Sequence, residues 1–144
     1  MIHVAVGIAM ESNPGRAVIA ACVTRGGSPV RTCRVTESVT IGHAYWMALE
    51  LALDRLDGRT AVIHTNFTSL VRTGPYHVGV GALPYELLAN RCIERLRKTR
   101  SSVEHTRTRN PTVQTPEARW VRWVSARAFE ALRAWQEQGI EGAA

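Results

Sequence analysis

The sequence lacks long apolar runs and a cysteine framework. No apolar stretch approaches the roughly 20 residues that a membrane helix needs, so no membrane association is expected. Its three cysteines, Cys22, Cys33 and Cys92, are widely spaced and odd in number, which fits neither a disulfide scaffold nor a zinc site. The first residues lack a basic region followed by a long apolar segment, so we expect no secretory signal and a cytoplasmic location.

Signatures of common catalytic sites are missing as well. The chain has no glycine-rich phosphate loop, no Gly-x-Ser-x-Gly elbow and no paired-cysteine metal motif. His43, His64 and His105 could each act as a general base, but isolated histidines beside strands are more often structural. We therefore expect no cofactor.

Basic residues are plentiful and unevenly placed. The net charge is +6, and residues 91–135 hold eleven Arg and Lys against four acidic residues, so this third of the chain carries the positive charge. Clustered cations favour a polyanionic partner because they release counterions from a phosphate backbone. Seventeen of the eighteen basic residues are Arg, a bias that a GC-rich genome would also produce, so charge alone does not decide for nucleic acid.

Alternating apolar residues and turn residues predict an antiparallel three-stranded start. The expected strands cover residues 2–8, 17–23 and 30–39, separated by Gly- and Pro-containing turns. Thr40 is a predicted N-cap for a largely buried helix that ends at Asp57-Gly58. The following short strand, residues 61–65, requires parallel pairing across this helix.

The second half continues with alternating helices and strands. Residues 73–83 are rich in Gly and Pro and predict a loop. A basic amphipathic helix is expected over residues 85–98, a fifth strand over 102–108, and a last helix from Pro116 to about residue 138. No linker or repeat divides the chain, so one domain is expected over residues 1–144.

Three short segments add to this pattern of elements. They are Asn13-Pro14-Gly15 after the first strand, residues 44–49 (AYWMAL) in the first helix, and residues 62–71 (VIHTNFTSLV) at the fourth strand. They resemble, respectively, the Asn-Pro-Gly turn, the first-helix pattern and the fourth-strand turn of the ribonuclease H-like family. The resemblance implies an α/β fold, with a mixed five-stranded sheet flanked by helices in the order β-β-β-α-β-α-β-α.

The resemblance also implies where the family's metal-binding carboxylates would stand. Gly7 takes the first Asp position, although a shift of one residue gives Ile8; Tyr45 takes the place of the helix Glu, and Asn66 that of the next Asp. The last Asp corresponds to Arg119, Arg122 or Trp123, depending on the gap chosen. The family's two divalent metals need anionic oxygens, so we expect no bound metal, no catalytic residues and a pseudoenzyme.

Other carboxylates do not favour a displaced metal site. Glu11 lies in the first turn, Glu50 is more than a helical turn beyond Tyr45, and Asp54 and Asp57 continue toward the far end of the helix. We therefore do not expect these carboxylates to meet at one metal site.

The basic surface supports the first functional hypothesis. In the last helix Arg119, Arg122, Trp123 and Arg133 share one face, and guanidinium groups beside an exposed indole suit phosphate contact and base stacking. We predict a noncatalytic nucleic-acid-binding module, for which the resemblance favours an RNA–DNA hybrid or structured RNA. The candidate binding residues are Arg91, Arg95, Lys98, Arg107, Arg109, Arg119, Arg122, Trp123 and Arg133.

The second hypothesis is a protein-interaction scaffold or homo-oligomer without a nucleic-acid role. Tyr45, Trp46, Trp123 and the loop of residues 74–83 would form its contact surface, since aromatic residues are favoured interface anchors. Salt separates the two hypotheses, because binding to nucleic acid weakens steeply as ionic strength rises.

Overall fold

Five strands form one mixed sheet. The computed structural model describes residues 1–24, 29–73 and 85–143. The strand order is β3-β2-β1-β4-β5, with β1 antiparallel to β2 and parallel to β4. β2 and β3 pair antiparallel, and β4 and β5 pair parallel. The strands are β1 (Ile2–Met10), β2 (Gly15–Val23), β3 (Arg31–Val39), β4 (Ala61–Thr65) and β5 (Ser102–His105).

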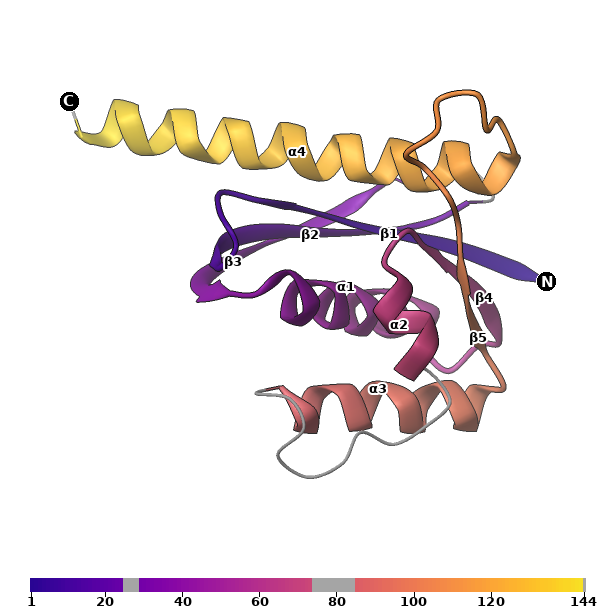
Figure 1. Ribbon diagram of the computed structural model, residues 1–144. Coiled ribbons are helices and arrows are strands. Elements are labelled where there is room, and N and C mark those ends of the chain that lie inside the picture. The colour runs from indigo at the N-terminus through magenta and orange to yellow at the C-terminus, as the bar shows by residue number, and fades with distance from the viewer. Residues whose placement is uncertain (25–28, 74–84, 144) are drawn as a thin grey trace.

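Helices cover both faces of this sheet (Figure 1). On one face lies α1, with α3 packed against its outer side. The long helix α4 crosses the opposite face, and its C-terminal end projects past the strands. The helices are α1 (Ile41–Leu56), α2 (Thr68–Thr73), α3 (Glu86–Thr99) and α4 (Pro116–Ala143). The expected α/β architecture, a five-stranded mixed sheet flanked by helices, is therefore confirmed.

The central strand β1 separates two apolar clusters. Val4 and Val6 point into the cluster beneath α1, whereas Ala5 and Ala9 belong to the cluster beneath α4. The residues between Val4 and Gly7 are all buried, because helices cover both faces of the strand. Small side chains on the second face allow the α4 backbone to come close to the sheet.

Helix α1 begins and ends where its sequence predicts. The Thr40 hydroxyl accepts a hydrogen bond from the His43 N–H at 3.2 Å, as an N-cap should. Asp57 ends the helix with a φ of 49°, and Gly58 follows with a φ of 82°. The wholly buried Trp46 and Leu49 anchor the helix to the sheet.

Several details differ from the sequence prediction. The fifth strand ends at His105 instead of residue 108, because its partner β4 ends at Thr65. The Thr65 carbonyl accepts the last hydrogen bond from the Thr106 N–H, and the chain then leaves the sheet. The short helix α2 was not predicted, and α4 runs beyond residue 138. The predicted loop of residues 73–83 lies almost wholly outside the described residues.

The sequence also raised the questions of the three cysteines and of membrane-spanning helices. Cys22 and Cys92 are free thiols buried in the core, whereas Cys33 is only partly buried. Among the described helices, none combines the length and apolar character required to cross a membrane.

Candidate functional site

A cavity of about 530 Å³ lies where the carboxyl ends of β4 and β5 meet the start of α1. Parallel strands end at the same edge of a sheet, so residues distant in sequence converge there. The residues that line it include Tyr45, Asn66, Thr68, His105, Arg107 and Arg109. Two of the positions assigned by resemblance, Tyr45 and Asn66, therefore do lie together.

Tyr45 and Asn66 are joined in a hydrogen-bond network. The Tyr45 hydroxyl donates to Asn66 Oδ1 at 2.6 Å, and Asn66 Nδ2 donates to Thr108 Oγ1 at 3.2 Å. Burial raises the pKa of Tyr45 to about 12, so the phenol keeps its proton and remains a donor at neutral pH. The Tyr45 ring stacks on Phe67 with centroids 4.5 Å apart, which fixes its orientation.

Gly7 contacts the last helix directly. A Cβ added at this position would lie 2.7 Å from Ser125 Oγ and 3.0 Å from the Ser125 Cα, so even alanine would require a shift of β1 or α4. The helix residue opposite Gly7 is Ser125, a position that the family resemblance did not indicate. Ser125 stands four residues after the buried Val121, so helical spacing places it on the buried face of α4. This spacing is the sequence feature that could have indicated its position.

The Arg122 side chain forms hydrogen bonds with backbone carbonyls of the same chain. Its guanidinium donates to the carbonyls of Val113 at 2.6 Å and Asn110 at 2.7 Å, and more weakly to the Thr108 carbonyl at 3.3 Å and 3.4 Å. The network from Tyr45 thus extends to α4. Arg122 fixes the segment between β5 and α4, whereas Arg119 is exposed.

The residues at these positions do not fit a pair of divalent cations. Asn66 already uses both ends of its amide, the Tyr45 hydroxyl is a protonated donor, and Ser125 fills the space beside Gly7. Hard cations need several carboxylate or carbonyl oxygens free to converge. Within residues 1–24, 29–73 and 85–143, no three His, Cys, Asp or Glu side chains gather closely enough to hold a metal ion.

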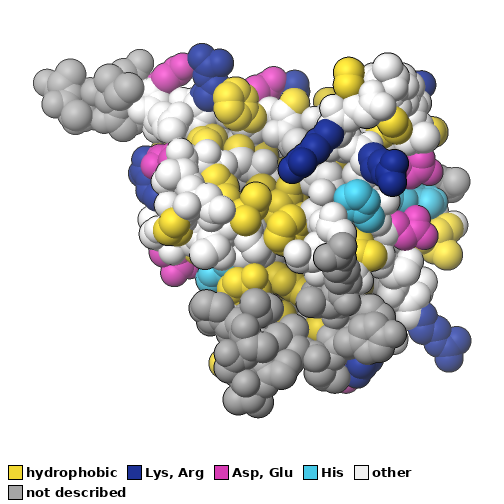
Figure 2. Space-filling model, in the orientation of Figure 1, with side chains coloured by type: hydrophobic (Ala, Val, Ile, Leu, Met, Phe, Trp, Pro, Cys, Tyr) yellow, Lys and Arg dark blue, Asp and Glu magenta, His cyan; other side chains and the backbone are white. Residues whose placement is uncertain are grey.

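The cavity instead has basic side chains at its rim. Arg107 and Arg109 are exposed, and no Asp or Glu occurs among the described residues that line the cavity. His105 is also exposed, with Nε2 at 3.4 Å from Thr68 Oγ1. Figure 2 shows Lys and Arg side chains close to histidine over the segment that joins β5 to α4. Guanidinium and hydroxyl groups in a cavity whose described lining holds no carboxylate suit a phosphate ligand.

The remaining predicted binding residues are not brought to this cavity. Arg91 pairs with Glu50 at 3.1 Å and Arg95 with Asp54 at 2.7 Å, which ties α3 to α1 and offsets the charge of both arginines. Lys98 is exposed on α3.

The C-terminal part of the predicted surface lies along α4. The Arg133 guanidinium lies 5.8 Å from the centre of the Phe129 ring. Trp123 is 48% exposed and lines a different cavity. The predicted binding residues therefore form several separate groups.

The prediction of an alternative contact surface is wrong for two of its residues. Tyr45 is 7% exposed and Trp46 is 1% exposed, because both pack between α1 and the sheet and cannot reach a partner. The loop of residues 74–83 lies outside the described residues. Trp123 is the member that reaches the surface.

The three predicted histidines have different surroundings. His64 is buried, its Nε2 lies 2.9 Å from His3 Nδ1, and Trp120 packs against both rings. Burial, with a smaller effect of the neighbouring His3, lowers the pKa of His64, and this outweighs the opposing effect of Glu104 and Glu117. His43 stacks on Tyr85. His105 is the one of the three that lines the cavity.

Comparisons with known proteins identify the fold. No protein-family model and no curated protein matches the sequence. Among solved structures, a ribonuclease H1 isolated from compost by a metagenomic approach, in complex with an RNA/DNA hybrid, is similar at 20% identity and a TM-score of 0.59, covering 74% of this chain and 85% of its own.

Two further structures are alike over nearly their whole length. Ribonuclease H1 from the halophilic archaeon Halobacterium salinarum has 16% identity and a TM-score of 0.59, covering 90% of this chain and 98% of that one. The N-terminal ribonuclease H domain of a Mycobacterium tuberculosis protein has 19% identity and a TM-score of 0.62, with coverages of 88% and 97%. This chain therefore has the ribonuclease H-like fold.

Proposed function

We propose that this protein is a noncatalytic nucleic-acid-binding module that uses the cavity at the ends of β4 and β5 for phosphate contacts. The observation that carries the proposal is the hydrogen-bonded set Tyr45, Asn66 and Thr108 beneath the exposed Arg107 and Arg109. A neutral, internally satisfied network offers little to a metal ion, while the arginines above it offer donors to a polyanion.

The fold supports a ligand with a helical shape. The solved compost ribonuclease H1 holds an RNA/DNA hybrid on a scaffold of the same fold. Arginines on the connection between β5 and α4 can contact backbone phosphates, which gives affinity without base sequence. We therefore favour an RNA–DNA hybrid or structured RNA, recognised through its backbone and 2′-hydroxyl groups.

The test measures binding and cleavage together. Labelled RNA–DNA hybrid, double-stranded RNA and double-stranded DNA are titrated across a salt series, with and without magnesium. We expect binding that weakens steeply with salt and no cleavage at any magnesium concentration. Magnesium-dependent cleavage by the pure protein would contradict the noncatalytic assignment.

Charge-reversal variants locate the site. Arg107→Glu/Arg109→Glu should weaken binding to every duplex by at least tenfold and lower the salt slope by about one for each phosphate that is no longer bound. Arg31→Glu/Arg34→Glu makes the same charge change on β3, at the opposite edge of the sheet, and should have a much smaller effect. Equal losses of affinity in the two variants would mean that only net charge matters and that the cavity is not the site.

A further inference from the structure

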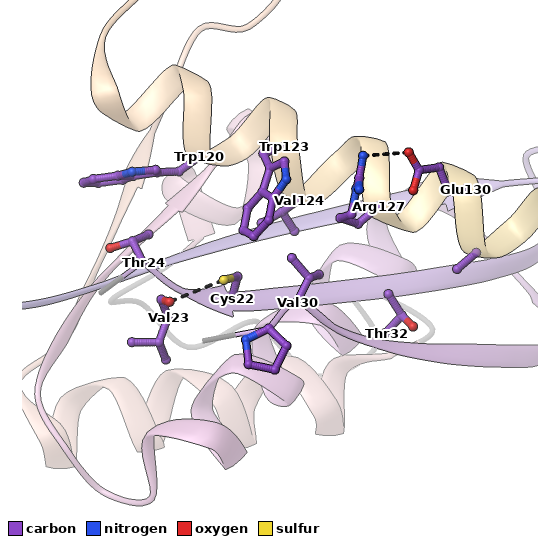
Figure 3. Close-up of a pocket in the computed structure, with 12 residues that line it drawn as sticks. Cys22, Val23, Thr24, Val30, Thr32, Trp120, Trp123, Val124, Arg127 and Glu130 are labelled. Atoms are coloured by element: carbon purple, nitrogen blue, oxygen red, sulfur yellow. Dashed lines mark hydrogen bonds and ion pairs between the residues drawn. The ribbon is translucent and has the colours of Figure 1, made fainter. Parts of the chain in front are cut away.

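A second cavity, of about 810 Å³, lies between α4 and the end of β2 (Figure 3). Its size is in the range of cavities that hold small molecules. Trp123 extends from α4 toward Cys22 and Val30, and Val124 completes an apolar floor. The hydroxyl-bearing Thr24 and Thr32 also line it.

The walls suit a flat ring with polar edges. Trp120 and Trp123 both contribute to the lining, and Trp123 keeps 48% of its surface exposed. An indole face left open to solvent beside apolar side chains can stack on another aromatic ring. The threonine hydroxyls can donate or accept hydrogen bonds at the edge of such a ring.

Cations flank the exposed indole along the helix. Arg119 and Arg127 stand four residues before and after Trp123, so all three share one helical face. Arg127 Nη2 donates to Glu130 at 2.6 Å, and this ion pair offsets the charge of Arg127 beside the cavity that Glu130 also lines. The buried Nε of Arg127 nevertheless has no hydrogen-bond partner among the described residues. A ligand with an acceptor group near this nitrogen would satisfy it.

From this arrangement we propose that the cavity takes one unpaired nucleobase, stacked on Trp123, with an acceptor atom of the base near the Arg127 Nε and the adjoining phosphate near the exposed Arg119. The inference rests on the proposed nucleic-acid function and extends it to a second site. Arg122 donates to the carbonyl of Asn110, which lines the first cavity, and the next residue, Trp123, lines the second.

A second copy of the chain fits this face less well. A twofold interface places the same patch on both subunits, so it would bring an exposed Arg119 from each copy to the shared interface, whereas Arg127 is already paired with Glu130. Such like-charge contacts disfavour association, whereas nucleotide phosphates offset the same charges. The charge pattern therefore favours a nucleotide over a second copy.

The experiment compares duplexes with and without an unpaired end. A blunt RNA–DNA hybrid and the same hybrid with a three-nucleotide single-stranded extension are titrated against the full chain. The extended hybrid should bind about tenfold more tightly, which is the scale of stacking one base on an aromatic side chain. Trp123→Ala should abolish this advantage, and Trp123→Phe should retain most of it.

Phe129→Ala is the matched control. Phe129 is 54% exposed on the same helix but does not line the cavity, so its replacement should leave the advantage intact. An unchanged advantage in Trp123→Ala, or an equal loss in Phe129→Ala, overturns the inference. Thermal unfolding of each variant verifies that it is folded.

A duplex-free measurement separates this inference from the proposed function. Single-stranded trinucleotides are titrated while tryptophan fluorescence is recorded, and Trp123→Ala should lose the quenching seen with the unmodified chain. Quenching without duplex binding would support the cavity and reject the duplex-binding function. Duplex binding without quenching would reject the nucleobase site alone. Sedimentation that shows a dimer dissociated by Trp123→Ala would assign the cavity to a second copy and overturn the proposal.

Discussion

Tyr45 shows how the surroundings of one side chain fix the chemistry of a position. Its ring is held by Phe67, its hydroxyl by Asn66, and its burial keeps the phenol protonated. A carboxylate in this environment would lose much of its hydration and would need a cation or several donors in compensation. The phenol needs one acceptor, and Asn66 provides it.

Replacing Tyr45 with Phe should destabilise the protein without altering its fold. The Asn66 Oδ1 atom would lose its donor, and the expected loss in the free energy of unfolding at pH 7 is about 1–2 kcal/mol. Urea unfolding measures this loss. Thr36→Val, at an exposed position of β3, is a control that removes a hydroxyl outside the network and should have little effect.

The same variant should respond differently to alkali. Because the pKa of Tyr45 is raised from 10 to about 12, its stabilising contribution is complete below pH 10 and is lost as pH rises toward 12. The stability difference between the unmodified protein and Tyr45→Phe should therefore narrow over this interval. A difference that stays constant between pH 9 and pH 12 would show that the phenol is not protected by burial.

At the scale of elements, the contact between β1 and α4 sets how closely the last helix approaches the sheet. Gly7→Ala should destabilise the protein by about 1–3 kcal/mol, because the new methyl group meets both the side chain and the backbone of Ser125. Urea unfolding should show partial recovery in Gly7→Ala/Ser125→Gly, where the hydroxymethyl group is gone but the backbone remains. No loss of stability in the single variant would mean that the helix moves away freely.

The connection between β5 and α4 depends on Arg122. Arg122→Gln removes most of the donors that reach the Thr108, Asn110 and Val113 carbonyls, and we expect a stability loss of about 2 kcal/mol. Amide hydrogen exchange should become faster in residues 106–115. Arg119→Gln, an equal change at an exposed site one turn earlier, should leave exchange there unaltered.

At the scale of the whole molecule, one sheet joins two apolar clusters. Trp46 belongs to the cluster beneath α1, whereas Trp120 and Trp135 pack against the one beneath α4. Strands β1 and β2 contribute side chains to both, so neither cluster can form fully without the shared strands. The molecule is expected to behave as one cooperative domain.

Equilibrium unfolding tests this cooperativity. Variants that keep only Trp46 or only Trp120 report on opposite faces of the sheet by fluorescence. Their urea midpoints, each compared with circular dichroism of the same variant, should coincide. Separate midpoints for fluorescence and circular dichroism within one variant would indicate that the two layers unfold independently.

Much of the fold could be predicted from local pattern. Alternation in the first 40 residues, the Thr40 cap and the Asp57-Gly58 end are local features, and the structure confirms each of them. The end of β5 could not be found in this way. It is set by the end of the partner strand β4 at Thr65, whose carbonyl accepts the last hydrogen bond from the Thr106 N–H, and the two strands are distant in sequence.

The sequence by itself determined the layered α/β fold, and its resemblance to a known family indicated Tyr45 and Asn66, which meet at the cavity. Local spacing and strand topology suffice for the fold, because it follows from helical and strand periodicity. Tertiary structure alone decided that Ser125 faces Gly7, that Arg122 is committed to backbone carbonyls, and that Trp123 lines a cavity. Such contacts depend on how elements distant in sequence pack, and no local pattern encodes the partner of a side chain.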